Sequence, residues 1–526
     1  MSSNKLKDAQ LFFKDLLKGR VKNETEYKEY STKFSLDLIK YDLYDKDISK
    51  ITQLIIDTDK LTSLNIRLSD TLVDKIILNR LLRKISLKRQ FTSLSFYIKY
   101  LKDDLLQIFI DFIGKLESTL NCLELSIKYQ DAKKENEILK NIIIHLIKNE
   151  NSGITDLTFD GVGFNTEDNL NLLNEYIQKN KNKLKNLVIT KNKFMNDTFT
   201  SDITHLQKVQ ISFCNIFTVK FFPSDILNLS NNNISKFGLE NIANNLKNKK
   251  CTLKKLNLSN NYIGNDGCFI LGESLKDNKS LLSLNLSGNN ILDDGVIYIA
   301  NNLRSEINST LQKINFRNNS ITSQGIIQFC TILKLEPIDR FRKIDFSVNY
   351  LDDSGLSEYG FFLSRFENIT SLVLSDRFSK NSLNNYFVYC ENLTNLKKIL
   401  FYQINLTEES TNHLCQILLN NKNIEKLMIS SNRNLHDGIL DISQGIQHNL
   451  KLTHLSLRTC FIGDKGAEAL ASALFKNIFI KDIDLEDNKI SSKGIEPLCD
   501  KVLGKISLLN LNLAHNLIDE ESSKFL

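Results

Sequence analysis

A short pattern of apolar residues recurs along most of the 526 residues, and it constrains the fold more than any other feature. Its form is L-x-x-L-x-L-x-x-N-x-I, as at Leu253, Leu256, Leu258, Asn261 and Ile263. Further clear copies start at Leu281, Leu311, Phe341, Ile424, Leu452, Ile480 and Leu508. Self-similarity at one fixed period predicts a stacked repeat architecture, because one such unit cannot bury its own apolar face.

Weaker copies of the pattern extend the array in both directions. They start near Lys33, Leu61, Phe91, Leu120, Ile154, Leu184, Leu206, Ser224, Ile369 and Leu396. The total is about 18 units, and from Ser224 onward the starts are 27 to 30 residues apart. We therefore expect an α/β solenoid, a horseshoe with a parallel β-sheet on its concave face and helices on its convex face.

Each unit divides into a strand half and a helix half. Alternate side chains of L-x-x-L-x-L point into one core, and the amide of the following Asn is expected to bond backbone groups that the turn leaves unpaired. Cys214 and Cys460 stand at this Asn position. A glycine stands before many predicted helices and is expected to supply the turn between strand and helix, at Gly267, Gly295, Gly325, Gly355, Gly438, Gly466 and Gly494.

This consensus resembles the ribonuclease-inhibitor-like class of leucine-rich repeats over roughly residues 33 to 526, most specifically from residue 224. That class includes the Ran GTPase-activating protein, the sensing domains of NOD-like receptors, tropomodulin-type actin regulators and an axonemal dynein subunit. The resemblance implies a protein partner on the concave face or its rim. Because the class shares a binding architecture, it does not select one function.

Departures from the pattern suggest three parts: an N-terminal helical cap over residues 1–32, irregular repeats over 33–223 and regular repeats over 224–526. Residues 1–32 are alternatively a partner-binding helix. The units starting at Leu184 and Leu206 are too short for a full helix, so we expect turns there. They mark either a joint or a change of curvature.

Composition bounds the function without naming it. A net charge of +6 is weak and does not favour nucleic acid as a partner, and no stretch is apolar enough for a signal peptide or a membrane span. The nine cysteines form no C-x-x-C pair, which predicts free thiols in a reducing compartment. Sequons at Asn257 and Asn285 fall inside predicted strands, where a glycan would block packing. We expect a cytoplasmic protein, with a cilium, the cytoskeleton or a host cytosol as alternatives.

The candidate partner site lies on predicted strand positions that face solvent. Most units carry Asn, Ser or Lys there, but three successive units carry apolar residues, with a tyrosine close by: Val373, Leu400, Met428 and Tyr402. Beside this apolar strip lie His454 and Arg458, followed by an acidic end with Asp484, Glu486 and Asp487. Exposed apolar patches mark interfaces, and the acidic end could steer a basic partner. The alternatives are a slipped register in the weak units and an ordinary solvated charge run.

No catalytic motif appears among the seven histidines or around any serine, and neither a metal nor another cofactor is implied. The sequence therefore favours a non-enzymatic intracellular scaffold or recognition protein that binds protein partners on the concave face and takes no small-molecule substrate. One alternative is a GTPase-activating regulator of a Ran-like GTPase, although no catalytic arginine can be placed for it. The other alternative is a structural component of a cytoskeletal or ciliary assembly.

Overall fold

The computed structural model describes the backbone of residues 33–37 and residues 62–69, 75–86, 91–99, 103–116, 119–128, 132–148, 152–192, 194, 198–337, 339–375, 378–433, 435, 438–503 and 507–519. The predicted cap over residues 1–32 lies outside these residues. The chain forms two compact units. The N-terminal unit extends to Asn245 and includes Lys250–Asn261, and the C-terminal unit comprises Leu246–Lys249 and the chain from Tyr262 onward.

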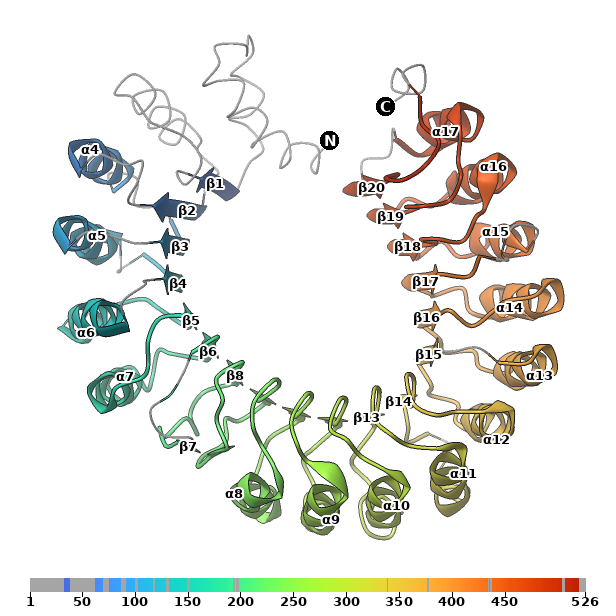
Figure 1. Cartoon of the computed structure of the whole chain (residues 1–526), viewed down its shortest axis with the longest axis horizontal. Helices are drawn as coiled ribbons and strands as arrows, with labels where there is room; N and C mark the ends of the chain where they lie inside the picture. Colours follow the sequence, from blue (N-terminus) through green and yellow to red (C-terminus); the bar gives the residue numbers. More distant parts are fainter. Residues whose placement is uncertain are drawn as a thin grey trace. The chain divides into compact units, whose positions relative to one another are not determined.

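The N-terminal unit has a layer of parallel strands backed by a layer of helices (Figure 1). Its repeat strands are β1 (Lys33–Asp37), β2 (Ser63–Ser69), β3 (Ser93–Lys99), β4 (Cys122–Lys128), β5 (Asp156–Asp160), β6 (Asn186–Thr190), β8 (Lys208–Ser212), β10 (Ile226–Asn228) and β11 (Lys255–Asn257). Its helices are α4 (Lys75–Ile85), α5 (Asp103–Leu116), α6 (Ala132–Lys148), α7 (Glu167–Lys179) and most of α8 (Lys236–Lys247).

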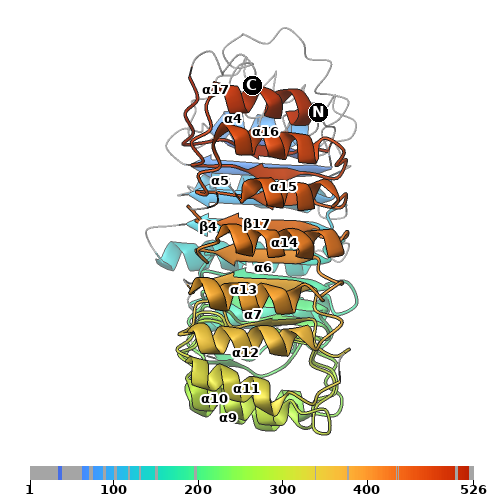
Figure 2. The same cartoon turned by 90° about the vertical axis from the view of Figure 1, so that its right-hand side faces the viewer.

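The C-terminal unit repeats the same two layers, and its successive helices lie side by side (Figure 2). Its strands are β12 (Ser283–Asn285), β13 (Lys313–Asn315), β14 (Lys343–Asp345), β15 (Ser371–Ser375), β16 (Lys398–Tyr402), β17 (Lys426–Ser430), β18 (His454–Ser456), β19 (Asp482–Asp484) and β20 (Asn510–Asn512). Its helices are α9 (Gly264–Leu275), α10 (Asp293–Asn302), α11 (Ser323–Ile332), α12 (Asp353–Ser364), α13 (Lys380–Cys390), α14 (Glu408–Asn420), α15 (Ile439–Gln447), α16 (Gly463–Leu474) and α17 (Ser492–Leu498), which continues as a π-helical turn over Cys499–Leu503.

The predicted α/β repeat fold is confirmed by this strand order and by the stacking of equivalent residues. Leu284 lies opposite Ile314, and Ile314 lies opposite Ile344 on the next parallel strand. All three side chains are about 1% exposed. The middle leucine of each repeat is therefore shared between neighbouring units, as expected if stacking buries the apolar face. In the part of the chain that the structure describes, no helix is long and apolar enough to cross a membrane.

The two short units differ from the expectation of turns. After β6 and β8, where a helix would not fit, the chain forms the short strands β7 (Thr198–Phe199) and β9 (Thr218–Val219), which pair in parallel with each other. An extended segment spans the same distance with fewer residues than a helix, because it rises more than twice as far per residue. Whether these units form a joint, and whether the repeat type changes at residue 224, both stay predictions.

The asparagine ladder forms as predicted. Asn319 Nδ2 donates to the Phe316 carbonyl at 2.8 Å in its own repeat and to the Leu286 carbonyl at 3.1 Å in the preceding one. Its Oδ1 accepts the Asn289 backbone N–H at 2.8 Å. Cys460 serves at the same position, where its Sγ lies 2.9 Å from the Ile429 carbonyl. Burial raises the pKa of this thiol to about 12, so it remains protonated.

The prediction for the glycines was wrong about their role. Six of the seven (Gly267, Gly295, Gly325, Gly355, Gly466 and Gly494) lie inside the first turn of a helix, Gly438 is the N-cap residue of α15, and none has a left-handed φ. They are needed because neighbouring helix starts approach closely. A Cβ on Gly325 would lie 2.4 Å from Asp293 Oδ1, and one on Gly494 would lie 2.7 Å from Asp464 Oδ1. The left-handed residue is usually the one before the ladder position, as with Asn318 at φ 55°.

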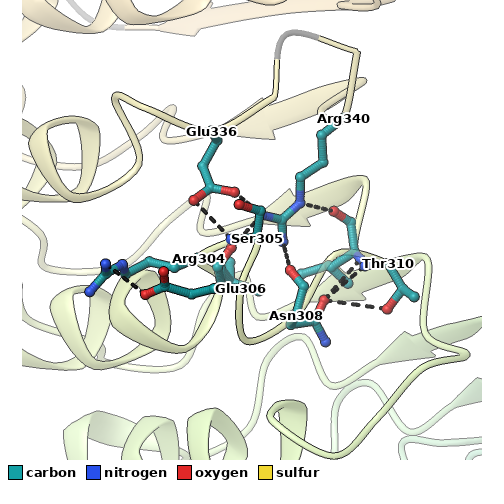
Figure 3. Close-up of polar contacts among 9 residues, drawn as sticks. Arg304, Ser305, Glu306, Asn308, Thr310, Glu336 and Arg340 are labelled. Carbon is teal, nitrogen blue, oxygen red and sulfur yellow. Dashed lines mark hydrogen bonds and ion pairs between the residues drawn. The ribbon is translucent and has the colours of Figure 1, made fainter.

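A buried ion pair lies in the segment that connects α11 to β14 (Figure 3). The Glu336 and Arg340 side chains are only 6% and 4% exposed, and Glu336 Oε2 lies 2.5 Å from Arg340 Nη1. Glu336 Oε1 also accepts the Ser305 backbone N–H at 2.9 Å, while Arg340 donates to the carbonyls of Leu303 and Asn308. Because both charges are paired and hydrogen-bonded, their burial is tolerated.

Candidate functional site

The predicted partner site lies on the solvent-facing side of the six-stranded sheet β15–β20, within the C-terminal unit. Parallel pairing places equivalent residues side by side in two rows. The central row is Val373, Leu400, Met428, Ser456, Asp484 and Asn512. The lysine row, two residues earlier on each strand, is Ser371, Lys398, Lys426, His454, Asp482 and Asn510. Because side chains alternate along a strand, both rows project from the same face.

The identity of the central-row residue goes with the length of the strand. In several repeats this residue is Asn or Asp, whose Oδ1 accepts the backbone N–H of the residue two positions later. The Arg317 N–H donates to Asn315 Oδ1 at 2.9 Å, and the Glu486 N–H donates to Asp484 Oδ1 at 3.2 Å. Such local bonds compete with the ladder of a strand. β13 and β19 accordingly have three residues each. Val373, Leu400 and Met428 cannot accept this bond, and β15, β16 and β17 each have five residues.

The structure places the residues of the apolar strip in register, but the end formed by Val373 is buried. Val373 lies opposite Leu400, and Leu400 lies opposite Met428. Val373 is nevertheless only 7% exposed, so the expectation that it is open to solvent was wrong. All five residues of β15 are buried, since its short side chains Ser371, Val373 and Ser375 lie beside longer ones on β16.

Leu400 and Met428 are half-buried, and Tyr402, on the same face, is 47% exposed. These three side chains form the open part of the strip, which we call the apolar patch. They occupy adjacent strands, about 4.8 Å apart. Their role in binding a partner stays a prediction.

The predicted polar residues lie next to the apolar patch and mostly bond to one another. His454 Nε2 lies 2.9 Å from Asp482 Oδ2, and Arg458 Nη2 lies 2.6 Å from Glu486 Oε1. Asn512 Nδ2 donates to Asp484 at 3.0 Å and to Glu486 at 2.9 Å. The acidic end therefore has much of its hydrogen-bonding capacity already used within the protein. Asp487 takes the left-handed turn that follows β19.

Sequence reasoning missed Lys398 and Lys426, which lie opposite each other in the lysine row beside the apolar patch. Lys398 is exposed and Lys426 is half-buried. Lys398 precedes Leu400 by two residues, and Lys426 precedes Met428 by two residues. The signal was available, because lysine occupies the same repeat position in two successive units. Lysine is so common on surfaces that the position alone did not attract notice.

Most of the thiols belong to the core and not to the site. All nine cysteines lie among the described residues, where no disulfide joins them, and seven of them are buried. Burial raises the pKa of Cys214 and of Cys390 to about 12. A thiol that remains protonated is a poor nucleophile and a poor metal ligand.

Comparisons with known proteins agree with this repeat architecture. A model of the leucine-rich repeat matches residues 249–271, 277–300, 448–471 and 476–499. The segments contain β11, β12, β18 and β19, each with most of the helix that follows. They therefore contain the same strand and helix halves that the sequence pattern predicts.

Three solved structures show a distant likeness. The TLR13–ssRNA13 complex is 17% identical with a TM-score of 0.39, and the match covers 83% of this chain and 62% of that one, so this chain spans less than two thirds of its length. An internalin from Listeria monocytogenes is 14% identical with a TM-score of 0.31, covering 88% of this chain and 92% of that one. Actin-binding site 2 of leiomodin-1 is 20% identical with a TM-score of 0.21, covering 34% and 87% respectively. At these TM-scores the likenesses carry no inference about partners.

Proposed function

We propose that this leucine-rich repeat protein acts by holding a protein partner on the sheet face of β15–β17, and that it serves binding rather than catalysis. The apolar patch is the observation that carries the proposal. Leu400, Met428 and Tyr402 are contiguous and at least partly exposed, at positions where most other repeats place polar residues. Exposed contiguous apolar side chains cost solvation free energy that a bound partner recovers.

Rigid placement of the patch supports the same proposal. Leu400 and Met428 are held by parallel strand pairing, and the residues directly before them, Ile399 and Leu427, are fully buried. Side chains anchored on strands lose little conformational entropy when a partner binds, because the backbone is already ordered. An apolar centre with charged residues around it is also the usual composition of a protein interface.

A comparison of three immobilised proteins in lysate from the source organism tests the proposal. They are the wild-type chain, the double variant Leu400→Asp/Met428→Asp, and the control Leu440→Asp/Ile478→Asp. Leu440 and Ile478 are 55% and 69% exposed and lie outside the sheet. We expect the patch variant to lose proteins that the wild type and the control both retain, with all three showing the same circular dichroism. Identical retention by all three would contradict the proposal.

A further inference from the structure

The two lysines beside the apolar patch differ from two other lysines at or next to a repeat strand. Lys343 lies 3.1 Å from Asp345 Oδ2, and Lys397 lies 3.7 Å from Glu425 Oε1. By contrast, no ion pair or hydrogen bond is formed by the ammonium groups of Lys398 and Lys426 with any of the described residues. Their positive charges are therefore uncompensated within that part of the chain.

The acidic residues of the same face do not compensate these lysines. Asp482 binds His454 and Asn510, and Glu486 binds Arg458 and Asn512. These acids lie on β19 or directly after it, while the lysines lie on β16 and β17. The uncompensated charges closest to the apolar patch are therefore the positive charges of the two lysines. The expectation that a basic partner is drawn to the acidic end concerns β19 and stays a prediction.

The placement of the lysines is also unfavourable for the protein alone. Lys398 lies directly opposite Lys426 on adjacent parallel strands. Like charges at directly opposed positions on neighbouring strands repel each other and so destabilise the sheet. A carboxylate placed between the two ammonium groups would remove this repulsion and gain attraction to both.

We propose that the segment bound at the apolar patch is acidic as well as apolar. It would carry at least one Asp or Glu beside a large apolar side chain, so that the carboxylate reaches Lys398 and Lys426 while the apolar group covers Leu400 and Met428. This inference rests on the proposed function and specifies the chemistry of the partner at the same face.

Selection from a phage-displayed library of random peptides tests the chemistry of the partner without knowing its name. The library is selected on the full-length wild-type chain, and the enriched peptides are then measured against Lys398→Glu/Lys426→Glu. The matched control is Lys422→Glu/Lys465→Glu, which makes the same change in charge at exposed positions outside the sheet. The patch variant Leu400→Asp/Met428→Asp is measured in parallel.

We expect the enriched peptides to pair Asp or Glu with Leu, Ile or Phe. Their affinity should fall about tenfold or more for Lys398→Glu/Lys426→Glu, and it should stay within about twofold for the control. Peptides without acidic enrichment, no enrichment at all, or peptides that lose affinity for the patch variant but keep it for Lys398→Glu/Lys426→Glu would overturn the acidic-partner inference. The last of these results would leave the proposed function standing, whereas peptides indifferent to both variants would contradict it.

Discussion

Asp293, in the first turn of α10, holds Thr322, the residue that caps the next helix. Its Oδ1 accepts the Thr322 backbone N–H at 2.7 Å, and its Oδ2 accepts the Thr322 hydroxyl at 2.6 Å. Asp464 accepts the same two bonds from Ser491, both at 2.7 Å. Because Thr322 and Ser491 are the N-cap residues of α11 and α17, each helix start depends on the repeat before it.

Replacing Gly325 tests this link between helix starts. A methyl group there would press on the Asp293 carboxylate, so Gly325→Ala is expected to destabilise α11 by about 1–3 kcal/mol. Native-state hydrogen exchange of the α11 amides measures the loss. In the double variant Gly325→Ala/Asp293→Ala the carboxylate is absent, so this variant should lose less stability than the two single variants lose in sum. A loss equal to that sum would contradict the close approach of Gly325 to Asp293.

The Glu336–Arg340 pair gives a prediction about buried charge. Arg340→Ala leaves the Glu336 carboxylate buried without its cation, and we expect a loss of about 3–5 kcal/mol in the free energy of unfolding. The nearby pair Arg304–Glu306 is the control, because its side chains are 49% and 63% exposed. Arg304→Ala should cost less than about 1 kcal/mol. Urea denaturation of both variants checks the difference, and equal losses would exclude a special role for the buried pair.

Asn488 allows the ladder to be tested with a substitution that the protein already uses. Its Oδ1 accepts the Cys460 backbone N–H at 3.0 Å, and its Nδ2 donates to the Leu457 carbonyl at 2.8 Å. Asn488→Ala leaves both groups unpaired and should cost about 2–4 kcal/mol. Asn488→Cys should cost less, since the thiol of Cys460 makes the corresponding contact to a carbonyl of the preceding repeat, that of Ile429. Thermal unfolding ranks the variants, and a cysteine variant no more stable than the alanine variant would contradict this account.

Asp352 gives a prediction about pH. Hydrogen bonds from the Gly355 backbone and from Ser323 and Ser354 lower the pKa of this N-cap carboxyl to about 2. A carboxyl whose pKa is lower in the folded state stabilises the fold above its unfolded pKa, near 3.8, and this stabilisation is lost as the pH falls toward 2.

Comparing the wild type with Asp352→Ala over pH isolates the contribution of this carboxyl. The wild type should be more stable by about 1 kcal/mol at pH 6, and the difference should shrink steadily between pH 4 and pH 2. Asp352→Asn, which keeps a cap without a titrating group, is the control. A difference that does not change with pH would show that the carboxylate charge has no part in the cap.

Features that depend on neighbours in the sequence were predictable. The strands and the ladder follow from spacings of two or three residues repeated in every unit, so Leu284, Ile314 and Asn319 could be placed from the sequence alone. The role of Gly325 could not, because the contact that requires it comes from Asp293 in another repeat. Val373 was misjudged for the same reason, since its burial depends on the side chains of the strands beside it.

The sequence by itself determined that the chain is a stack of strand-and-helix units, because each unit encodes its own alternation and can bury its leucines only against a copy of itself. The tertiary structure decided which charges on the face are left over. Asp482 and Glu486 find partners on neighbouring repeats, whereas Lys398 lies between Ser371 and Lys426 and pairs with no carboxylate of the described residues. Pairing of charges depends on distance in space, and residues 28 positions apart become neighbours only when the units stack.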